Sequence, residues 1–399
     1  MTDTPMALEG LVVLDLTRVL AGPTCTQLLG DLGAEVIKVE NPATGGDDTR
    51  QWGPVFVTGP DGARTDLSAY FMSANRNKLS VAVDIAAPEG QAAIRALAAR
   101  ADVVVENFKA GGLAKYGLDH ETLMGAHPGL IWCSITGYGL TGPNAAKPGY
   151  DLMAQGFGGL MSLTGEPEGE PQKVGVAVAD LTAGMYAAVG ILAALRHRDR
   201  TGEGQHVDVA LVDAQMSWLV NQGVSYLQTG EVPGRFGNAH ASIVPYQAFA
   251  VSDGHVLVAV GNDGQFVRFC DFLGEDWHAD PRFRTNPLRI DNRDMLIPLI
   301  EARMARLTRA EVIAGLEARK VPVGPVNDLA QAFASDQALA RGAMVRMKAP
   351  DAAEGEVRLL GNPLRLSRTP VTYRRPPPRC GADTADVPET AALGARPKG

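Results

Sequence analysis

One carboxylate, Asp180, lies between a short apolar run and a long helical pattern. Residues 175–179 are strand-like in their valines, whereas apolar residues after Asp180 recur with a 3.6-residue period. The members of this stripe are Leu181, Met185, Val189, Leu192 and Leu195. Basic residues at 196–198 and a turn at Gly202 end the pattern. The spacing predicts that Asp180 is the helix N-cap, where its carboxylate stays ionised and accepts backbone N–H bonds.

A carboxylate in this position has two possible roles. It can simply cap the helix, and the spacing alone favours this interpretation. It can also act as a catalytic nucleophile, since a carboxylate is already deprotonated and needs no general base. A second segment, Gly261 to Gln265 with the sequence GNDGQ, is either a plain strand-to-helix turn or a flexible loop.

Composition restricts the possible function classes. The chain has 399 residues, of which 45% are hydrophobic and 21% charged, so we expect two domains or one elaborated domain. A formal charge of −8 gives no support to non-specific nucleic-acid binding. The four cysteines are far apart, with no CxxC and no histidine at ligand spacing, which argues against a disulfide framework and against a structural zinc site. Without a signal-peptide pattern or a transmembrane-length apolar run, we expect a cytoplasmic protein with no membrane partner.

The first half of the chain alternates strands and helices. A strand at 11–16, a loop at 17–23, a helix at 24–32 and a strand at 35–40 form a β-α-β opening. Further strands are expected at 79–84, 102–106 and 129–135, with a helix at 88–100. This predicts a doubly wound α/β domain, in which ligands bind beyond the carboxyl ends of the strands. Neither G-x-G-x-x-G nor a P-loop motif is present.

The second half has a different pattern. Strands at 242–250 and 255–260 and helices at 266–272, 292–307 and 309–318 predict a smaller α+β domain. A Pro/Gly-rich link at 321–326 follows, then strands near Met344 and Val357 that return to a sheet. We expect the proline-rich tail from Arg374 to be extended or partly disordered. The expected boundaries are 1–225, 226–330 and 331–399.

Taken together, many of these segments resemble the family III CoA-transferases, a superfamily that includes formyl-CoA and carnitine-CoA transferases and 2-methylacyl-CoA racemases. The matching stretches are LDLTRVLAGP, GDLGAEVIKVE, NRNK, VVVENF, CSITGYGLTGP, GYD, VGVAVADLTAG, TGEGQHVDVAL and GNDGQF. GDDTRQWGPVF, GNAHASIVPYQAF and RTNPLRIDNR are most similar to the succinate–glutarate (hydroxymethylglutarate) branch. The resemblance implies a Rossmann-like large domain, a small α+β domain, a chain that returns to the large domain, and an interlocked homodimer.

The resemblance also implies roles for individual residues. Asp180 matches the catalytic aspartate that carries first the acyl group and then CoA. Asp151 and Tyr150 lie near it, and Gly261, Gly264 and Gln265 match the glycine loop that keeps water out. The positions implied in CoA binding are Val19, Leu20, Ala21, Asn107, Phe108 and Lys115, with Lys38, Arg76, Lys78 and Lys109 as nearby basic candidates. The substrate is an acyl-CoA, with no metal.

Departures from the family patterns narrow the reaction. Formyl-CoA transferase has glutamine where Leu20 stands and arginine where Asn41 stands, and the first change argues against oxalate or formate. The racemases have a histidine where Tyr150 stands, and a phenol with a pKa of about 10 is a poor base at neutral pH. We therefore expect a CoA-transferase that uses succinyl-CoA or a similar dicarboxylyl-CoA. The alternatives are a racemase and a non-catalytic acyl-CoA-binding protein. The candidates for holding the second carboxylate of a dicarboxylic acid are Arg18, Arg50, Arg76 and His240.

Overall fold

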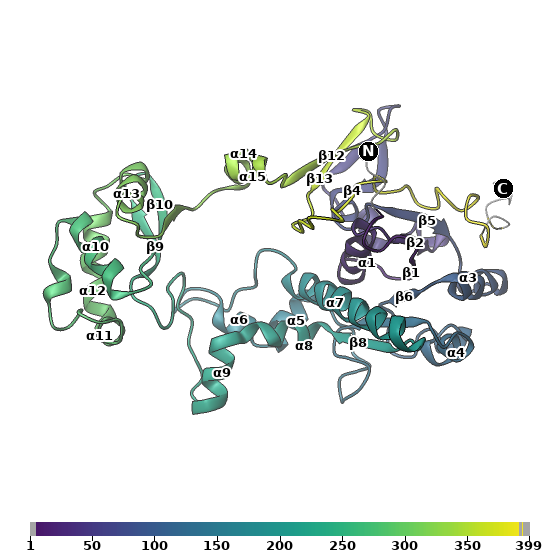
Figure 1. Ribbon diagram of the computed structural model, residues 1–399, viewed down its shortest axis with the longest axis horizontal. Coiled ribbons are helices and arrows are strands. Elements are labelled where there is room, and N and C mark those ends of the chain that lie inside the picture. The colour runs from purple at the N-terminus through teal and green to yellow at the C-terminus, as the bar shows by residue number, and fades with distance from the viewer. Residues whose placement is uncertain (1–4, 391–392, 394–399) are drawn as a thin grey trace. The chain divides into compact units, whose positions relative to one another are not determined.

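The structure, a computed structural model, describes residues 5–390 and residue 393 of the chain (Figure 1). The chain forms two compact units. Unit 1 comprises Met1–Leu160, Lys173–Leu227 and Asp336–Gly399, and unit 2 comprises Met161–Gln172 and Gln228–Ser335. The small unit therefore includes a segment at 161–172, which the sequence pattern did not predict.

Unit 1 is built on a six-stranded parallel sheet. The strands lie in the order β5-β2-β1-β6-β7-β8, which is the order 3-2-1-4-5-6 of doubly wound nucleotide-binding sheets. Their bounds are β1 (Val12–Asp15), β2 (Glu35–Glu40), β5 (Lys78–Ala82), β6 (Val103–Glu106), β7 (Ile131–Thr136) and β8 (His206–Ala210). The strand order reverses between β1 and β6, where Val13 is paired with Val36 on one side and Val103 on the other. A ligand crevice is expected at this reversal, beyond the carboxyl ends of the strands.

Helices cover both faces of this sheet because its valines and isoleucines point alternately to each side. On one face Val13, Val105 and Ile135 pack against α1 (Ala21–Asp31), α5 (Asp151–Phe157), α7 (Val178–Thr201) and α8 (Leu211–Met216). On the other face Leu14 and Val104 pack against α3 (Pro88–Arg100) and α4 (His120–Ala126). The predicted α/β alternation is thus present as a mixed α/β unit.

The long helix α7 differs from the sequence prediction in three ways. It begins at Val178, with Ala177 at the N-cap, so Asp180 is the third helical residue, and residues 174–177 do not form a strand. Its alanine-rich face is buried, whereas Met185 and Val189 of the predicted stripe are 46% and 63% exposed. We expected no apolar run of transmembrane length, but among the described residues α7 is long and apolar enough to cross a membrane. However, 61% of its most apolar window is buried within the protein, as in a core helix.

Three further segments of unit 1 lie outside the large sheet. A hairpin of β3 (Phe56–Thr58) and β4 (Arg64–Ser68) lies within the polar region after β2. Strands β12 (Met344–Lys348) and β13 (Glu356–Leu360) form their own antiparallel pair rather than joining the large sheet, and they lie beside β4 (Figure 1). The tail is ordered up to residue 390: Asp383 donates its N–H to Ser80 O of β5, and Val387 is buried. Residues 391–392 and 394–399 of the predicted tail lie outside the described residues.

Unit 2 contains a three-stranded antiparallel sheet in the order β11-β10-β9, formed by β9 (Tyr246–Val251), β10 (Gly254–Ala259) and β11 (Val323–Pro325). The predicted Pro/Gly link therefore contributes a strand. Phe249, Val256 and Phe266 form a core with the surrounding helices. These helices are α10 (Asp263–Leu273), α11 (Asn286–Asp291), α12 (Arg293–Met304) and α13 (Arg309–Glu317). The remaining α-helices among the described residues are α2 (Ala69–Met72), α6 (Leu160–Leu163), α9 (Val220–Thr229), α14 (Leu329–Ala334) and α15 (Asp336–Ala340).

Candidate active site

A cavity of about 450 Å³ opens in unit 1 where the strand order reverses. Its wall comes from the loops that follow β1, β6 and β7 and from the first turns of α1 and α7. The residues predicted from the sequence that line it are Asp180, Tyr150, Arg18, Val19, Leu20, Ala21, Asn107, Phe108, Lys109 and Lys115. Most of the predicted site in the first half of the chain is thus brought together in one space.

Asp180 lies in this wall as a buried carboxyl group, 8% exposed. Its side chain has no hydrogen-bond partner among the described residues, so the predicted capping bonds are not formed. Burial, followed by the nearby negative charge of Asp151, raises the pKa of Asp180 to about 7. The prediction that Asp180 is a fully ionised cap is therefore wrong, because a carboxyl group with this pKa is only partly ionised at neutral pH.

Asp151 makes the capping interactions that were expected of Asp180. Its Oδ1 accepts hydrogen bonds from the backbone N–H of Ala179 at 2.8 Å and of Asp180 at 3.4 Å. Its Oδ2 accepts one from Gln155 Nε2 at 2.7 Å, and Gln155 Oε1 accepts the N–H of Val174 at 2.9 Å. Gln155 is fully buried and was not predicted, although its place one helical turn after Asp151 is visible in the sequence. Asp151 and Gln155 thus fix the first turn of α7.

The turn between β1 and α1 faces the same cavity. Asn107 holds it from the β6 side: its Oδ1 accepts the Arg18 N–H at 3.0 Å and its Nδ2 donates to the Arg18 carbonyl at 2.7 Å. In the described structure Leu20, the N-cap of α1, makes no side-chain capping bond, and the N–H groups of Leu20, Ala21 and Gly22 have no partner. Unpaired N–H groups at a helix N-terminus favour a negatively charged or polarised oxygen.

Four basic side chains surround the cavity: Arg18, Lys109, Lys115 and Lys147. All four are exposed, so their charges are available to a ligand. Lys147 was missed because it lies in a long irregular segment after β7, where no helix or strand pattern places it. Within reach of one cavity, these cations suit a ligand with several phosphate charges.

The other basic candidates have different roles. Lys38 pairs with Asp47, Lys78 with Asp15, and all four side chains are fully buried. Burial, opposed by the charge of Asp15, lowers the pKa of Lys78 to about 8. These lysines do not line the Asp180 cavity, and their charges are already balanced by carboxylates.

Two of the three candidate arginines are likewise engaged in buried ion pairs. Arg50 Nη2 is 2.6 Å from Glu40 Oε1, and Arg76 Nη2 is 2.5 Å from Asp31 Oδ2. Both arginines are buried. The structure therefore argues against Arg50 and Arg76 as ligands of a substrate carboxylate, because neither guanidinium is free to leave its partner.

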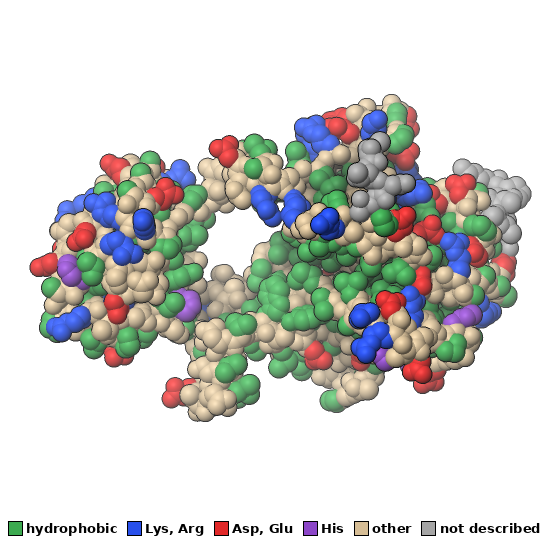
Figure 2. Space-filling model, in the orientation of Figure 1, with side chains coloured by type: hydrophobic (Ala, Val, Ile, Leu, Met, Phe, Trp, Pro, Cys, Tyr) green, Lys and Arg blue, Asp and Glu red, His purple; other side chains and the backbone are tan. Residues whose placement is uncertain are grey.

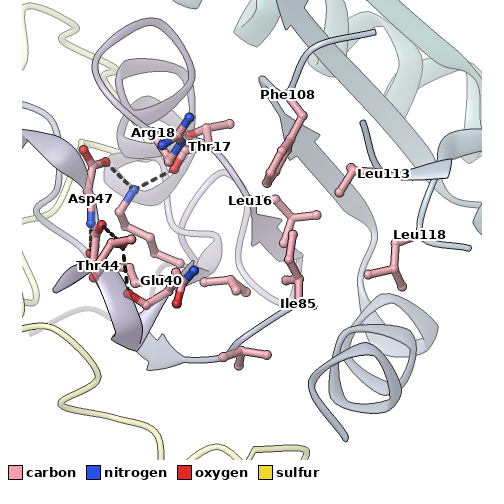
Figure 3. A pocket seen from close by; sticks show the side chains of 15 residues that line it. Leu16, Thr17, Arg18, Glu40, Thr44, Asp47, Ile85, Phe108, Leu113 and Leu118 are labelled. Atoms are coloured by element: carbon pink, nitrogen blue, oxygen red, sulfur yellow. Dashed lines mark hydrogen bonds and ion pairs between the residues drawn. The ribbon is translucent and has the colours of Figure 1, made fainter. Parts of the chain in front are cut away.

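A second cavity of about 230 Å³ adjoins the first and shares Arg18, Ile85 and Phe108 with it. Its wall is largely apolar: Figure 3 shows Leu16, Ile85, Phe108, Leu113 and Leu118 facing a common space, with Asp47 and Glu40 on the opposite side. Asn41, which follows β2, also lines it. An apolar slot beside a basic cavity suits a ligand with a flat apolar part and a charged part.

Tyr70 is a further residue that sequence reasoning missed. Burial, followed by the charges of Asp180 and Asp151, raises the pKa of its phenol. Its ring lies edge-on to Trp52, with centroids 5.1 Å apart. Tyr70 does not line the Asp180 cavity, and its position in the short helix α2 gives no motif that would have revealed its electrostatic contact with the two carboxylates.

The glycine loop and His240 belong to unit 2. Helix α10 begins at Asp263, with Asn262 as its N-cap accepting the Gln265 N–H at 2.9 Å, while Gln265 Oε1 accepts the Gly261 N–H at 2.7 Å. Gly261 to Gln265 is therefore an ordered strand-to-helix turn, the simpler of the two expectations. His240 Nδ1 accepts the Ser242 N–H at 3.0 Å. The role of this turn as a lid, and of His240 in binding a carboxylate, stay predictions.

Among the described residues, no group of three or more His, Cys, Asp and Glu side chains could hold a metal ion. The site instead combines a buried, unpaired carboxyl group, two helix N-termini and a cluster of cations. This arrangement can attack an electrophilic carbonyl with Asp180 while binding an anionic carrier of the acyl group.

Comparison with known proteins identifies the family. The model of "CoA-transferase family III" matches residues 8–384. The chain is 47% identical to the succinate–glutarate CoA-transferase of Agrobacterium fabrum, covering 97% of each chain. It is 42% identical to the succinyl-CoA:glutarate CoA-transferase of Mus musculus, over 96% of this chain and 86% of that one. A crystal structure of a CAIB/BAIF family protein from Brucella suis matches with a TM-score of 0.84 at 46% identity, over 98% of this chain and 99% of the other. The chain therefore belongs to CoA-transferase family III and is a CoA-transferase.

Proposed function

We propose that this enzyme transfers CoA between a dicarboxylyl-CoA and a free carboxylic acid, with Asp180 as the covalent carrier. The observation that carries the proposal is the buried carboxyl group of Asp180, unpaired in the described structure and facing a cavity that cations surround. The donor we favour is succinyl-CoA, with glutarate or a similar dicarboxylic acid as acceptor. The printed names of the relatives from Agrobacterium fabrum and Mus musculus support this choice.

The reaction proceeds by paired substitutions at carbonyl carbons. A carboxylate oxygen of Asp180 attacks the thioester carbonyl, the C–S bond breaks, and CoA leaves as a thiolate, which gives a mixed anhydride. The thiolate then attacks the Asp180 Cγ, and succinate departs as a carboxylate, which leaves an aspartyl-CoA thioester. The acceptor carboxylate attacks Cγ and expels the thiolate. That thiolate attacks the acceptor's carbonyl, releasing the new acyl-CoA and the Asp180 carboxylate, with no net proton transfer.

The raised pKa of Asp180 has a direct role in this sequence. A carboxylate that is poorly solvated is a stronger nucleophile than one in water, since no hydration shell must be removed. The unpaired N–H groups at the start of α1 can stabilise the negative oxygen that develops as the carbonyl is attacked. The basic side chains around the cavity and these N–H groups favour the ionised form of Asp180 once the ligand excludes water.

The two adjoining cavities support a single extended CoA. The adenine suits the apolar slot around Ile85 and Phe108, and the phosphates suit Lys109, Lys115 and Lys147. The pantetheine arm then runs along Val19 to Ala21 towards Asp180. Arg18 stays the candidate of unit 1 for the second carboxylate, since its only ion pair among the described residues is an exposed one with Asp48.

An interlocked homodimer is the proposed assembly. Large apolar side chains are exposed on α5, α7 and α8. They include Leu152, Met153, Phe157, Met185, Tyr186, Val189, Leu192 and Met216. Figure 2 shows apolar surface over the part of unit 1 that α7 occupies in Figure 1. A continuous apolar surface of this kind supports an interface with a second copy.

Covalent trapping tests the proposed function. The protein is incubated with succinyl-CoA and then with hydroxylamine or borohydride, and its peptides are analysed by mass spectrometry. A transferase is trapped at Asp180, whereas a racemase or a simple binder stays unmodified. The Asp180→Ala variant is expected to fold and to lose transfer activity and trapping. Turnover in that variant, or an unmodified Asp180 in the wild type, would reject the assignment.

A further inference from the structure

Val19, in the turn that faces Asp180, has a backbone conformation that disfavours its side chain. Its φ is +72°, in the left-handed region that glycine adopts freely and β-branched residues rarely adopt. Such a conformation persists only where the surrounding structure imposes it, and it is found most often at functional sites. Val19 lines the cavity together with Leu20 and Ala21, so the strained residue lies in the wall of the proposed active site.

Two side chains hold the turn in this conformation. Asn107 binds both backbone groups of Arg18, as described above. Asp47 binds the next residue: its Oδ1 and Oδ2 lie 3.2 and 3.3 Å from the Val19 nitrogen and accept its N–H. The turn is also tightly packed, because a Cβ added at Gly22 would lie 2.3 Å from the Thr17 side chain. Without the Asp47 carboxylate, the N–H of Val19 would have no acceptor in this position.

The Asp47 carboxylate is itself fixed. Lys38 Nζ donates to Asp47 Oδ2 at 3.0 Å and to the Thr17 carbonyl at 2.9 Å, so the same ammonium group ties the carboxylate to the strand end before the turn. Thr49 donates its N–H and its hydroxyl to Asp47 Oδ1 at 3.0 and 2.8 Å. Figure 3 shows Asp47 facing Thr17 and Arg18 across this contact. Burial would raise the pKa of Asp47, but the charge of Lys38 lowers it, so the group stays ionised.

We propose that Asp47 is a positioning residue for CoA transfer: it holds Val19 in the left-handed conformation and thereby aims the N–H groups of Leu20 and Ala21 into the Asp180 cavity. The inference rests on the proposed function, because these N–H groups matter only if a thioester carbonyl is attacked beside them. Without its hydrogen bonds to Asp47, Val19 relaxes to negative φ and the peptide group between Val19 and Leu20 rotates. The donors then no longer face the developing oxyanion.

This role predicts a loss of kcat that a change at Val19 can repair. Asp47→Asn keeps the size of the side chain but replaces one acceptor by an NH₂ group, which must face either Lys38 or Thr49 and in both positions also lies beside the Val19 N–H. We expect its kcat to fall at least tenfold per active site, with a smaller change in KM for succinyl-CoA. Active sites are counted by borohydride trapping at Asp180, so unfolded protein does not enter the rate.

The double variant Asp47→Asn/Val19→Gly provides the decisive comparison. Glycine adopts positive φ without strain, so the turn keeps its shape with a weaker clamp, and we expect at least a threefold recovery of kcat over Asp47→Asn. Asp47→Asn/Val19→Ala is the matched control, since alanine removes the same valine contacts but retains a Cβ. It should show no recovery. Equal rates in the two double variants, or an unchanged kcat in Asp47→Asn, would overturn the proposal.

A thermal measurement covers the case in which Asp47→Asn does not fold. In the wild-type background, Val19→Gly should have a higher Tm than Val19→Ala, the reverse of the usual order, because the left-handed conformation penalises only alanine. A higher Tm for Val19→Ala would show that no left-handed turn is imposed and would end the proposal. Failure of the proposed function is separate: it would appear as an untrapped Asp180 in the wild type, whatever these variants do.

Discussion

Asp151 caps the helix on which Asp180 stands, and its carboxylate accepts the Asp180 N–H at 3.4 Å. The same negative charge that holds the first turn of α7 therefore raises the pKa of the Asp180 carboxyl group, adding to the larger effect of burial. Positioning and electrostatic tuning of the proposed nucleophile come from one side chain.

This relationship predicts a pH profile. Only the carboxylate form of Asp180 attacks, so kcat/KM for succinyl-CoA should rise with pH through an apparent pKa near 7, the value that burial and Asp151 set. In Asp151→Asn the neighbouring charge is gone, the pKa of Asp180 falls, and the midpoint should move to lower pH. The measurement is the pH dependence of kcat/KM in both proteins.

Asp119→Asn is a suitable control for that shift. Asp119 caps α4 through the Thr122 N–H, so this substitution also weakens a helix cap, but it lies outside the Asp180 cavity. Its profile should have the wild-type midpoint. A midpoint that stays unchanged in Asp151→Asn would show that Asp151 does not tune Asp180.

The raised pKa of Asp180 also predicts that its ionised carboxylate destabilises the folded protein. A carboxyl group with a pKa of 3.8 when unfolded and about 7 when folded binds its proton more tightly in the folded state. Its contribution to stability is therefore full below about pH 4 and is lost as the pH rises through 7, a change on the order of 4 kcal/mol. Asp180→Asn, which cannot ionise, should be more stable than wild type at pH 8 and equally stable at pH 3.5. Chemical denaturation at the two pH values checks this, and a variant less stable than wild type at pH 8 would contradict it.

Sequence patterns predicted this fold and part of its site for identifiable reasons. The valines of β1, β2 and β6 and the β-α-β spacing determine a parallel sheet, and the loops after the strands then meet at one edge by geometry alone. The family motifs placed Asp180, Asn107 and Val19 to Ala21 in one site. The strand valines, the spacing of strands and helices, and the family motifs each involve residues that are close together in the sequence, so they can be recognised from the sequence alone.

What sequence reasoning missed depends on partners that are distant in the chain. Lys38 and Lys78 resemble free basic residues until the fold brings Asp47 and Asp15 to them. Asp180 fits the N-cap pattern, yet the cap comes from Asp151, which is 28 residues before the Ala179 N–H that it binds. The apolar stripe of α7 predicted a helix, but it did not show which face is buried: small alanines pack in the core, and Met185 and Val189 are exposed. Charge pairing and close helix packing of this kind are decided by tertiary structure.

Lys147 should bind the phosphates of CoA. It lines the Asp180 cavity and is exposed, so Lys147→Ala should raise KM for succinyl-CoA about three- to tenfold with little change in kcat, because its contact is the same in the ground and transition states. The effect should shrink as salt is added. Lys348→Ala, an exposed lysine on β12 away from both cavities, is the matched control and should behave as wild type. Equal KM values for the two variants would remove Lys147 from the CoA site.

Phe108 should bind the adenine. Its ring lines both cavities, and Phe108→Ala would remove one wall of the apolar slot. We expect KM for succinyl-CoA to rise about tenfold, since burying a large aromatic surface contributes more than one kcal/mol. A succinyl thioester of pantetheine lacks the adenine, so its kcat/KM should be the same in wild type and variant. A loss of similar size with both substrates would place Phe108 at the pantetheine arm instead.

The exposed face of α7 should hold two chains together. Val189 is 63% exposed in the single chain, and in the proposed homodimer it is buried by the partner. Val189→Asp would place a charge in that apolar interface, so the variant should sediment as a monomer, or dissociate at protein concentrations where wild type is a dimer. Arg200→Asp places a negative charge at an exposed position near the C-terminal end of α7. It serves as the control and should remain dimeric. Analytical ultracentrifugation over a hundredfold range of concentration measures both. A wild-type protein that is monomeric throughout this range, or a Val189→Asp variant that stays fully dimeric, would mean that this face has another function.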